Sequence, residues 1–327
     1  MNLNVKWNRN LIGILFMVMA LSGAGCVPCM SQDTVTIISS TTTLGSLAEE
    51  VGGDHVTVIS LVQPGVCPSH FDIRPSHVAE VEQAKLILFH GIEPWLEDLI
   101  TASGNEDIIR VNLNGPWNTP VLAQAKIEII RDALITVDPE NTSDYEKNAG
   151  NAIETLNETS EIIKAEISQY NVSEIPVLCM DWQVSSVEWM GGSIVGSYGP
   201  PETLSVKDID ELISIGKDQQ ALMVIDNLQS GTDVGAQIAA AIGAEHVVFS
   251  NYPSAVPGTE TVVQMITYNA RQFIDAVQKI QTEAEEISQL ETQLEKSKEK
   301  TQIYGVLAAV FFIVSAVEAV LLYVRKK

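Results

Sequence analysis

Residues 33–62 read DTVTIISSTTTLGSLAEEVGGDHVTVISLV and predict a strand, a helix and a second strand in quick succession. Residues 35–39 form an apolar run rich in β-branched side chains, and residues 56–62 form another. Between them, residues 40–43 supply hydroxyl caps, residues 44–51 have helical spacing, and a glycine pair ends the helix. Two strands joined through a helix are expected to lie parallel in one sheet.

Outside this unit, apolar runs alternate with helical segments over most of the chain. Predicted strands lie at residues 86–89, 108–111, 176–180, 221–225 and 246–249, and predicted helices at 77–83, 95–102, 235–242 and 262–281. Residues 142–170 instead show one amphipathic pattern of roughly 28 residues, which is near 40 Å long at about 1.5 Å per residue. The fold class is therefore α/β, with two Rossmann-like lobes of parallel sheet joined by this long spine helix.

The chain has 327 residues with 19 Lys+Arg and 42 Asp+Glu, so that its formal net charge is −23 at pH 7. This acidic balance excludes a nucleic-acid binder that neutralises phosphates with a basic face. The sequence contains no Gly-x-Ser-x-Gly, P-loop or His-Glu-x-x-His motif, and no nucleophile that completes a triad with His70 and Asp72. We therefore expect a protein that is not an enzyme.

The N-terminus has the form of an export signal. Lys6 and Arg9 precede an apolar run at residues 11–21, and small residues then lead to Cys26. The stretch LSGAGC resembles a lipoprotein cleavage box in which Cys26 carries the lipid. Three alternatives stay open for residues 1–26: a plain signal peptide, a lipoprotein signal peptide, and an uncleaved N-terminal anchor.

The C-terminal segment predicts a membrane anchor. Residues 303–324 are almost wholly apolar, and about 20 such residues span the hydrocarbon core of a bilayer. The sequence Arg-Lys-Lys at residues 325–327 follows at once, which places the C-terminus in the cytoplasm. Residues 282–302 are rich in Glu and Lys and predict a solvated helical stalk between the lobes and the anchor.

The two ends together orient the middle of the chain outward. Three Asn-x-Ser/Thr sequons, at Asn141, Asn157 and Asn171, agree with this orientation. The expected location is the cell membrane, with an extracytoplasmic ectodomain. The expected divisions in chain order are a signal peptide of plain or lipoprotein type (1–26), an N-terminal α/β lobe (33–140), the spine helix (141–171), a C-terminal α/β lobe (172–281), the stalk (282–302) and the transmembrane anchor (303–324).

Several stretches of the predicted lobes resemble one protein family. PGVCPSHFDIRPSH at residues 64–77 is similar to its segment with proline-glycine, a metal-binding histidine, an aromatic-acidic pair and Pro-Ser. AKLILFHGIEPWL at residues 84–96 is similar to its third strand and the Glu-x-Trp-Leu sequence that follows. Residues 138–149 resemble the start of its spine helix, and residues 262–269 resemble its closing helix. In this order, the segments resemble the extracytoplasmic solute-binding proteins of zinc- and manganese-type ABC importers.

This resemblance implies two lobes that clasp a divalent metal ion and deliver it to an ABC permease with a cytoplasmic ATPase. The family's ligands are histidines from the first lobe and, from the second, a carboxylate with a further histidine or carboxylate. Carried over by position, these ligands fall on Ser69 or, with a shift of one residue, His70, then on Trp117, on Met180 beside Asp181, and near Asn251. A rigid spine helix also implies a modest closure of the lobes.

Residues near the expected crevice offer further ligands. Cys67 and His70 are three apart in one loop, so both can reach a single ion. His90 follows a predicted strand, and Cys179 and Asp226 lie at the ends of strands in the second lobe. Thiols and imidazoles favour zinc or monovalent copper over manganese. We expect a divalent ion, zinc, bound by members of the set Cys67, His70, His90, Cys179, Asp226 and Asn251.

The residues also leave alternatives open. Cys67 and Cys179 are metal ligands, unpaired thiols, or partners in an interlobe disulfide, which an oxidising compartment permits. Trp117 and Trp182 are expected to line the crevice, and aromatic walls suit a chelated metal or an organic cofactor. The third alternative is a cell-surface interaction module that keeps the fold and has no ligand.

Overall fold

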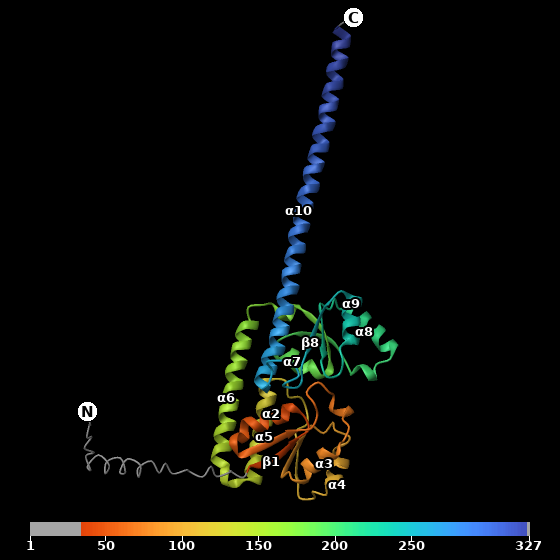
Figure 1. Ribbon diagram of the computed structural model, residues 1–327. Coiled ribbons are helices and arrows are strands. Elements are labelled where there is room, and N and C mark those ends of the chain that lie inside the picture. Colours follow the sequence, from red (N-terminus) through yellow and green to blue (C-terminus); the bar gives the residue numbers. More distant parts are fainter. Residues whose placement is uncertain (1–33, 326–327) are drawn as a thin grey trace, which may run out of the picture. The chain divides into compact units, whose positions relative to one another are not determined.

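The structure is a computed structural model that describes residues 34–325. The targeting segment expected at residues 1–26 lies outside the described residues. Within them, two parallel sheets of four strands each are formed, one in each half of the chain (Figure 1). The strands are β1 (Val35–Ser39), β2 (Val56–Ser60), β3 (Leu86–Phe89), β4 (Ile109–Asn112), β5 (Pro176–Met180), β6 (Ser193–Tyr198), β7 (Met223–Asn227) and β8 (Glu245–Phe249).

The α-helices are distributed between the strands as crossover connections, with a few additions. They are α2 (Thr42–Gly52), α3 (Pro75–Glu82), α4 (Leu96–Ser103), α5 (Pro120–Val137), α6 (Thr142–Ile167), α7 (Val184–Trp189), α8 (Val206–Asp218), α9 (Asp233–Ile242) and α10 (Val262–Arg325). Every strand pairing is parallel, as expected for strands joined through helices. The predicted α/β fold class, with a long helix between two lobes, is thus confirmed.

The two sheets share one strand order. The first runs β2-β1-β3-β4 and the second runs β6-β5-β7-β8. In each sheet, the strand that comes first in the chain lies between the second and the third. The direction of the strand order therefore reverses between β1 and β3 in the first sheet and between β5 and β7 in the second, and each of these two pairs is hydrogen-bonded. Ligands of open parallel sheets bind beyond the carboxyl ends of the strands at such a reversal. The segments that follow β1, β3, β5 and β7 are therefore the places to look for a site.

Alternation along the strands divides the core into three parts. Ile37 and Leu88 of the first sheet, with Ile225 of the second, join one large apolar cluster that includes α2, α5, α6 and the first turns of α10. The next residue along a strand points to the other face, as Ile38 does under α3 and α4 and Val224 does under α8 and α9. Both faces of both sheets are covered by helices, which explains why the strands are continuous apolar runs.

Helix α5 is an addition to the elements expected from the sequence. Thr119 caps it by accepting a hydrogen bond from the Leu122 N–H, and Pro120 occupies its first turn. Apolar residues at spacings of three and four, including Ile127 and Ile130, bury one face of the helix against α6 and α2. The cap, the proline and this spacing can all be read from the sequence, so the rules for helix starts and helical spacing could have predicted this helix too.

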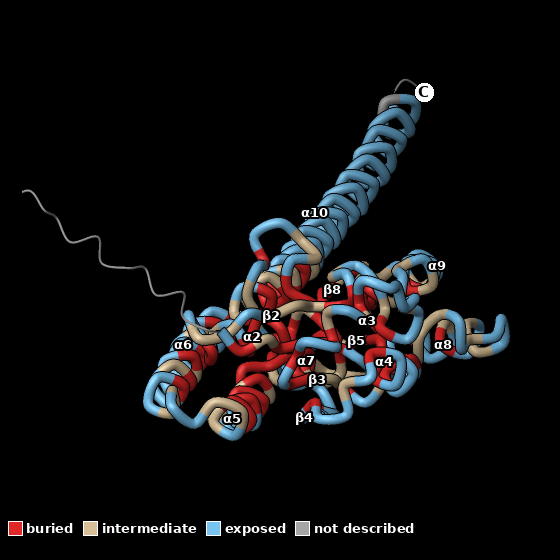
Figure 2. The backbone as a smooth tube through the Cα atoms, turned by 60° about the horizontal axis from the view of Figure 1, so that its bottom comes forward, coloured by how far each residue is buried: buried red, intermediate tan, exposed pale blue. Residues whose placement is uncertain are grey.

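Helix α10 combines three segments that the sequence analysis separates. Its first part packs on the lobes, with Phe273 and Val277 fully buried. From residue 281 onward it is almost entirely exposed, and Figure 2 shows this exposure along the outer length of the helix. Residues 281–304 are mostly helix formers such as Glu, Lys, Gln and Leu, and they include neither glycine nor proline. The helix therefore continues through this segment.

Candidate functional site

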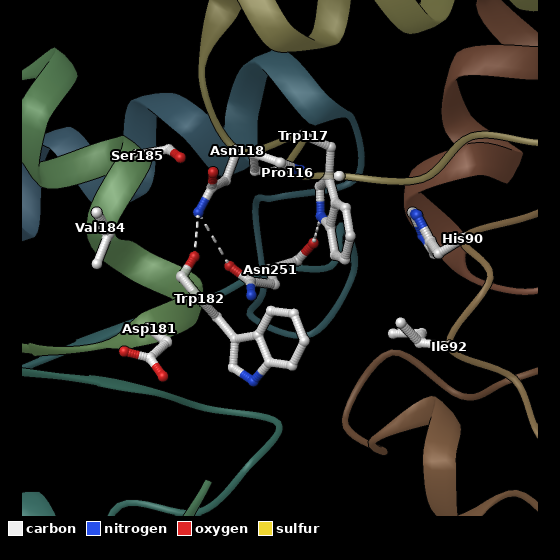
Figure 3. A pocket seen from close by; sticks show the side chains of 11 residues that line it. His90, Ile92, Pro116, Trp117, Asn118, Asp181, Trp182, Val184, Ser185 and Asn251 are labelled. Atoms are coloured by element: carbon white, nitrogen blue, oxygen red, sulfur yellow. Dashed lines mark hydrogen bonds between the residues drawn. The ribbon is translucent and has the colours of Figure 1, made fainter. Parts of the chain in front are cut away.

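The candidate site lies where loops from the carboxyl ends of both sheets meet. His90 follows β3 directly, and Trp182 follows β5 within a short 3-10 turn. Trp117 precedes α5, and Asn251 lies two residues beyond β8. These four residues come from four different loops, and only the folding of both sheets brings them together (Figure 3).

Together they line a pocket of about 380 Å³. Its walls are formed by His90, Ile92, Gly115, Pro116, Trp117, Asn118, Asp181, Trp182, Val184, Ser185 and Asn251. The indole of Trp182 is 40 % exposed and reaches into this space, whereas Trp117 is only 5 % exposed and forms part of the wall. The volume lies in the range of small-molecule pockets, about 300–1,000 Å³.

A network of amide groups ties the two halves of the chain together at this pocket. Asn118 Nδ2 donates to the Trp182 carbonyl at 2.8 Å, and the Trp117 indole N–H donates to the Asn251 carbonyl at 2.9 Å. Gln183 Nε2 donates to Asn251 Oδ1 at 3.0 Å. These groups are uncharged, and the hydrogen bonds between them form without a metal ion.

His90 is held as a neutral side chain. Its ring stacks on Trp117 with 3.9 Å between centroids, and its Nε2 lies 2.9 Å from the Thr41 hydroxyl. Burial and, to a smaller extent, the positive charge of Lys126 lower the pKa of His90 to about 3, against an opposing effect of the Leu113 carbonyl. The imidazole is therefore neutral at pH 7 and already engaged by neighbours on its face and at Nε2.

Cys67 and Asn251 also border a second, much smaller cavity beside the first. It measures about 30 Å³, room for about one water molecule, and shares Trp117 and Trp182 with the larger pocket. Cys67 is half-buried and precedes the 3-10 turn of residues 68–70. Of the expected sulfur ligands, Cys67 is the one that the fold brings to the crevice.

Two expected ligands do not face the crevice, because strand alternation turns them away. Cys179 has the same parity as Val177 in β5 and is buried in the large core cluster. Asp226 has the parity of Val224 and points to the opposite face of β7, where it accepts hydrogen bonds from the Tyr198 hydroxyl and from His246 Nε2, both at 2.7 Å. For both residues, a position near the end of a strand was not enough to bring the side chain into the site.

His70 is exposed and borders neither cavity. Among residues 34–325, no group of three or more His, Cys, Asp or Glu side chains is arranged to hold a metal ion. The structure thus brings Cys67, His90 and Asn251 to the crevice with both tryptophans, and leaves His70, Cys179 and Asp226 outside it. Neutral amides, with one imidazole and one carboxylate on opposite sides of the pocket, do not fit a bare divalent ion, which needs several converging anionic, thiolate or imidazole donors.

The two thiols of the described region are both unpaired, and they are expected to differ in reactivity. Burial, with the charges of Asp181 and Glu188, raises the pKa of Cys179 to about 12. In the fragment 33–281, we expect one thiol, Cys67, to react with Ellman's reagent under native conditions, and Cys179 to react only after unfolding. A Cys67→Ser variant should abolish the native reaction. Two blocked thiols, released only by a reductant, would contradict this expectation.

Comparison with known proteins places this architecture in a family. Residues 37–276 match the family model described as the zinc-uptake complex component A, periplasmic. The chain belongs to this family. Its members are extracytoplasmic metal-binding, solute-binding components of ABC importers rather than enzymes, which confirms the resemblance found in the sequence.

Individual relatives are distant in sequence. A putative metal-binding protein of Treponema pallidum (strain Nichols) is 23% identical over 273 residues, covering 72% of this chain and 84% of the relative. The manganese-binding lipoprotein MntA of Halalkalibacterium halodurans is 23% identical over 304 residues, covering 80% and 97%. A periplasmic metal-binding protein of Candidatus Liberibacter asiaticus has a similar structure, with a TM-score of 0.65 at 19% identity, covering 75% of this chain and 100% of the other.

Several residues of the site are not among those expected from the sequence. Asn118, Gln183 and Gln229 all belong to the buried amide network, and Gln229 Nε2 also donates to the Pro64 carbonyl at 2.9 Å. Each lies within three residues of a strand end or a helix start at the crevice. Their positions in the sequence could therefore have identified them as site residues. Neutral amide side chains are not typical metal ligands, however, so a search of the sequence for metal ligands does not select them.

Proposed function

We propose that this protein is the membrane-anchored solute-binding component of an ABC importer, and that its solute is a metal ion held in a small organic chelator. The observation that carries the proposal is the pocket of about 380 Å³ between two tryptophans, lined chiefly by uncharged groups. A bare ion leaves most of that volume empty and finds no converging set of charged donors there. We propose zinc as the ion, in line with the description of the family model.

The lining groups suit an organic ligand with apolar and hydrogen-bonding parts. The indole of Trp182 offers an exposed face against which a flat or aliphatic chelator can pack. Asn118 Oδ1 is buried and accepts no hydrogen bond from other groups in the described part of the chain. Asn118 is a lining residue of the pocket, and we propose that a donor on the chelator becomes the partner of this oxygen.

The anchor is proposed from the C-terminal end of α10. The helix Val262–Arg325 is long and apolar enough to cross a membrane, with a mean hydropathy of 2.5 over its most apolar window. We propose residues 303–324 as the transmembrane anchor, residues 282–302 as a stalk, and a cytoplasmic C-terminus. Captured solute is then delivered to a permease in the same membrane, powered by a cytoplasmic ATPase.

The proposal predicts that zinc chelates bind and that the free ion does not. Full-length protein in detergent, stripped of metal, is titrated with Zn²⁺ alone and with zinc complexes of citrate and of histidine, while tryptophan fluorescence is recorded. We expect at least one complex to quench fluorescence with an affinity at least about tenfold above that of Zn²⁺. Trp182→Phe should remove most of the signal, and Trp189→Phe, outside the pocket, should keep it.

Two results would count against the proposal, and metal content measured by mass spectrometry separates them. Near-stoichiometric zinc retained without any organic ligand, and lost in Cys67→Ser, would establish a bare-ion site instead. Failure to bind either the ion or the chelates would leave the fold as a surface interaction module.

A further inference from the structure

Lys126 is a buried cation directly behind the wall of the pocket. It lies on α5 and is only 5 % exposed. Its Nζ donates to the Leu113 carbonyl at 2.8 Å and to the Asn114 carbonyl at 2.7 Å. The next residue, Gly115, begins the loop that forms the pocket wall through Asn118. The ammonium group therefore holds the base of that loop in place.

The charge of Lys126 is not compensated by an anion. Both of its hydrogen-bond acceptors are backbone carbonyls, and in the described range it forms no salt bridge with Asp or Glu. Burial lowers the pKa of Lys126 to about 8, and no carboxylate opposes the shift. The side chain is still mainly charged at pH 7. A buried charge without a counter-ion is costly, so its presence behind the pocket points to a role.

The field of this cation reaches the pocket itself. Its charge acts on His90, which lines the pocket and stacks on Trp117. Water is largely excluded from these groups, so the positive potential is weakly screened. Asp181 is the one carboxylate in the lining, and it lies on the opposite side of the pocket from His90 (Figure 3). Glu93 is buried on the His90 side, where its carboxylate accepts hydrogen bonds from the His90 and Ile92 N–H groups and offsets positive charge there. The positive potential of Lys126 is therefore carried mainly by the wall of residues 115–118, next to the carbonyl groups that its Nζ binds.

We infer that this pocket selects an anionic chelate, and that the ligand places its negative oxygens against the wall formed by residues 115–118, in front of Lys126. This inference rests on the proposed function and specifies its substrate class. The same charge opposes a bare cation at that wall, which is consistent with an uncharged donor set. The Asp181 side of the pocket is left for the metal or for a positively charged part of the ligand.

The potential can be tested without any solute. Full-length protein in non-ionic detergent is quenched with iodide and with caesium at constant ionic strength, and the Trp182 signal is obtained by subtracting Trp182→Phe. Lys126→Gln, which keeps a hydrogen-bond donor, is expected to lower the ratio of iodide to caesium quenching at Trp182 by about twofold or more. Lys207→Gln removes an exposed charge on α8 and should leave the ratio unchanged. Lys126→Met serves as a second neutral variant if Lys126→Gln does not fold.

The selection is tested with zinc–citrate, which is anionic, and zinc bis-histidinate, which is neutral. We expect the wild type to prefer zinc–citrate by about tenfold, and neutralised Lys126 variants to lose this preference. Binding of both complexes without a preference, or a quenching ratio unaffected by Lys126→Gln, would overturn the inference and leave the proposed function standing. Binding of neither complex would overturn the proposed function and the inference with it.

Discussion

Replacing Gly235 by alanine is expected to lower the free energy of unfolding by about 3 kcal/mol. A Cβ at this position of α9 would overlap the carboxylate of Asp226, which lies directly beneath it on β7. The carboxylate cannot turn aside freely, because the Tyr198 hydroxyl and His246 Nε2 both hold it at 2.7 Å. Helix α9 must therefore move away from the sheet, which opens the apolar cluster it covers.

Urea unfolding of the fragment 33–281, which lacks the stalk and anchor, measures this loss. Gly150→Ala is the matched control, since Gly150 is exposed within α6 and an added Cβ meets nothing there. That substitution should raise stability by about 1 kcal/mol, the helix preference for alanine over glycine. In the double variant Gly235→Ala/Asp226→Ala, the cost should be smaller than the sum of the single costs by about 2 kcal/mol. Additive costs would show that Gly235 and Asp226 are not in contact.

Acid is expected to destabilise the protein strongly through His90. In the unfolded chain His90 has an ordinary pKa of 6.5, and in the folded protein burial and Lys126 lower that pKa to about 3. Between these values the unfolded state binds a proton that the native state does not, so unfolding is favoured as pH falls. The stability is fully present above pH 6.5 and declines toward pH 3, by about 5 kcal/mol in total.

The measurement is the free energy of unfolding of the fragment 33–281 at pH 7.5 and at pH 4. His90→Phe keeps an aromatic ring against Trp117 and removes the titrating group, so its stability should fall much less over this interval than that of the wild type. His70→Gln, which removes an exposed imidazole, is the control and should follow the wild type. Equal pH dependence in His90→Phe and the wild type would show that His90 is not the group responsible.

Local patterns were enough to predict most of the scaffold. The strands at residues 35–39, 86–89 and 176–180 have the bounds expected, because each is a short apolar run between turn or cap residues. Helix α6 begins at the expected residue and ends three residues early, at Ile167 instead of Tyr170. The bounds of strands and helices depend mainly on residues that are close in sequence, so one amino-acid sequence is enough to predict them.

Which residues form the site was harder to predict, because this depends on the direction in which each side chain points as well as on its position in the sequence. Cys179 and Asp226 lie near strand ends as expected, yet one residue along a strand decides which face a side chain joins. The burial of the Lys126 charge likewise could not be predicted from the sequence, because it depends on how α5 packs over the loop that starts at Leu113.

The sequence by itself determined the α/β class, the spine helix, the apolar C-terminal segment and the resemblance to metal-importer solute-binding proteins, since all of these are carried by local periodicity and ordered motifs. Only the tertiary structure decided that uncharged amides, a neutral His90 and two tryptophans form the pocket, with Lys126 behind its wall. The physical reason is that burial and convergence are properties of several loops at once. They set the charge state and the partners of each group, and no spacing in the sequence specifies them.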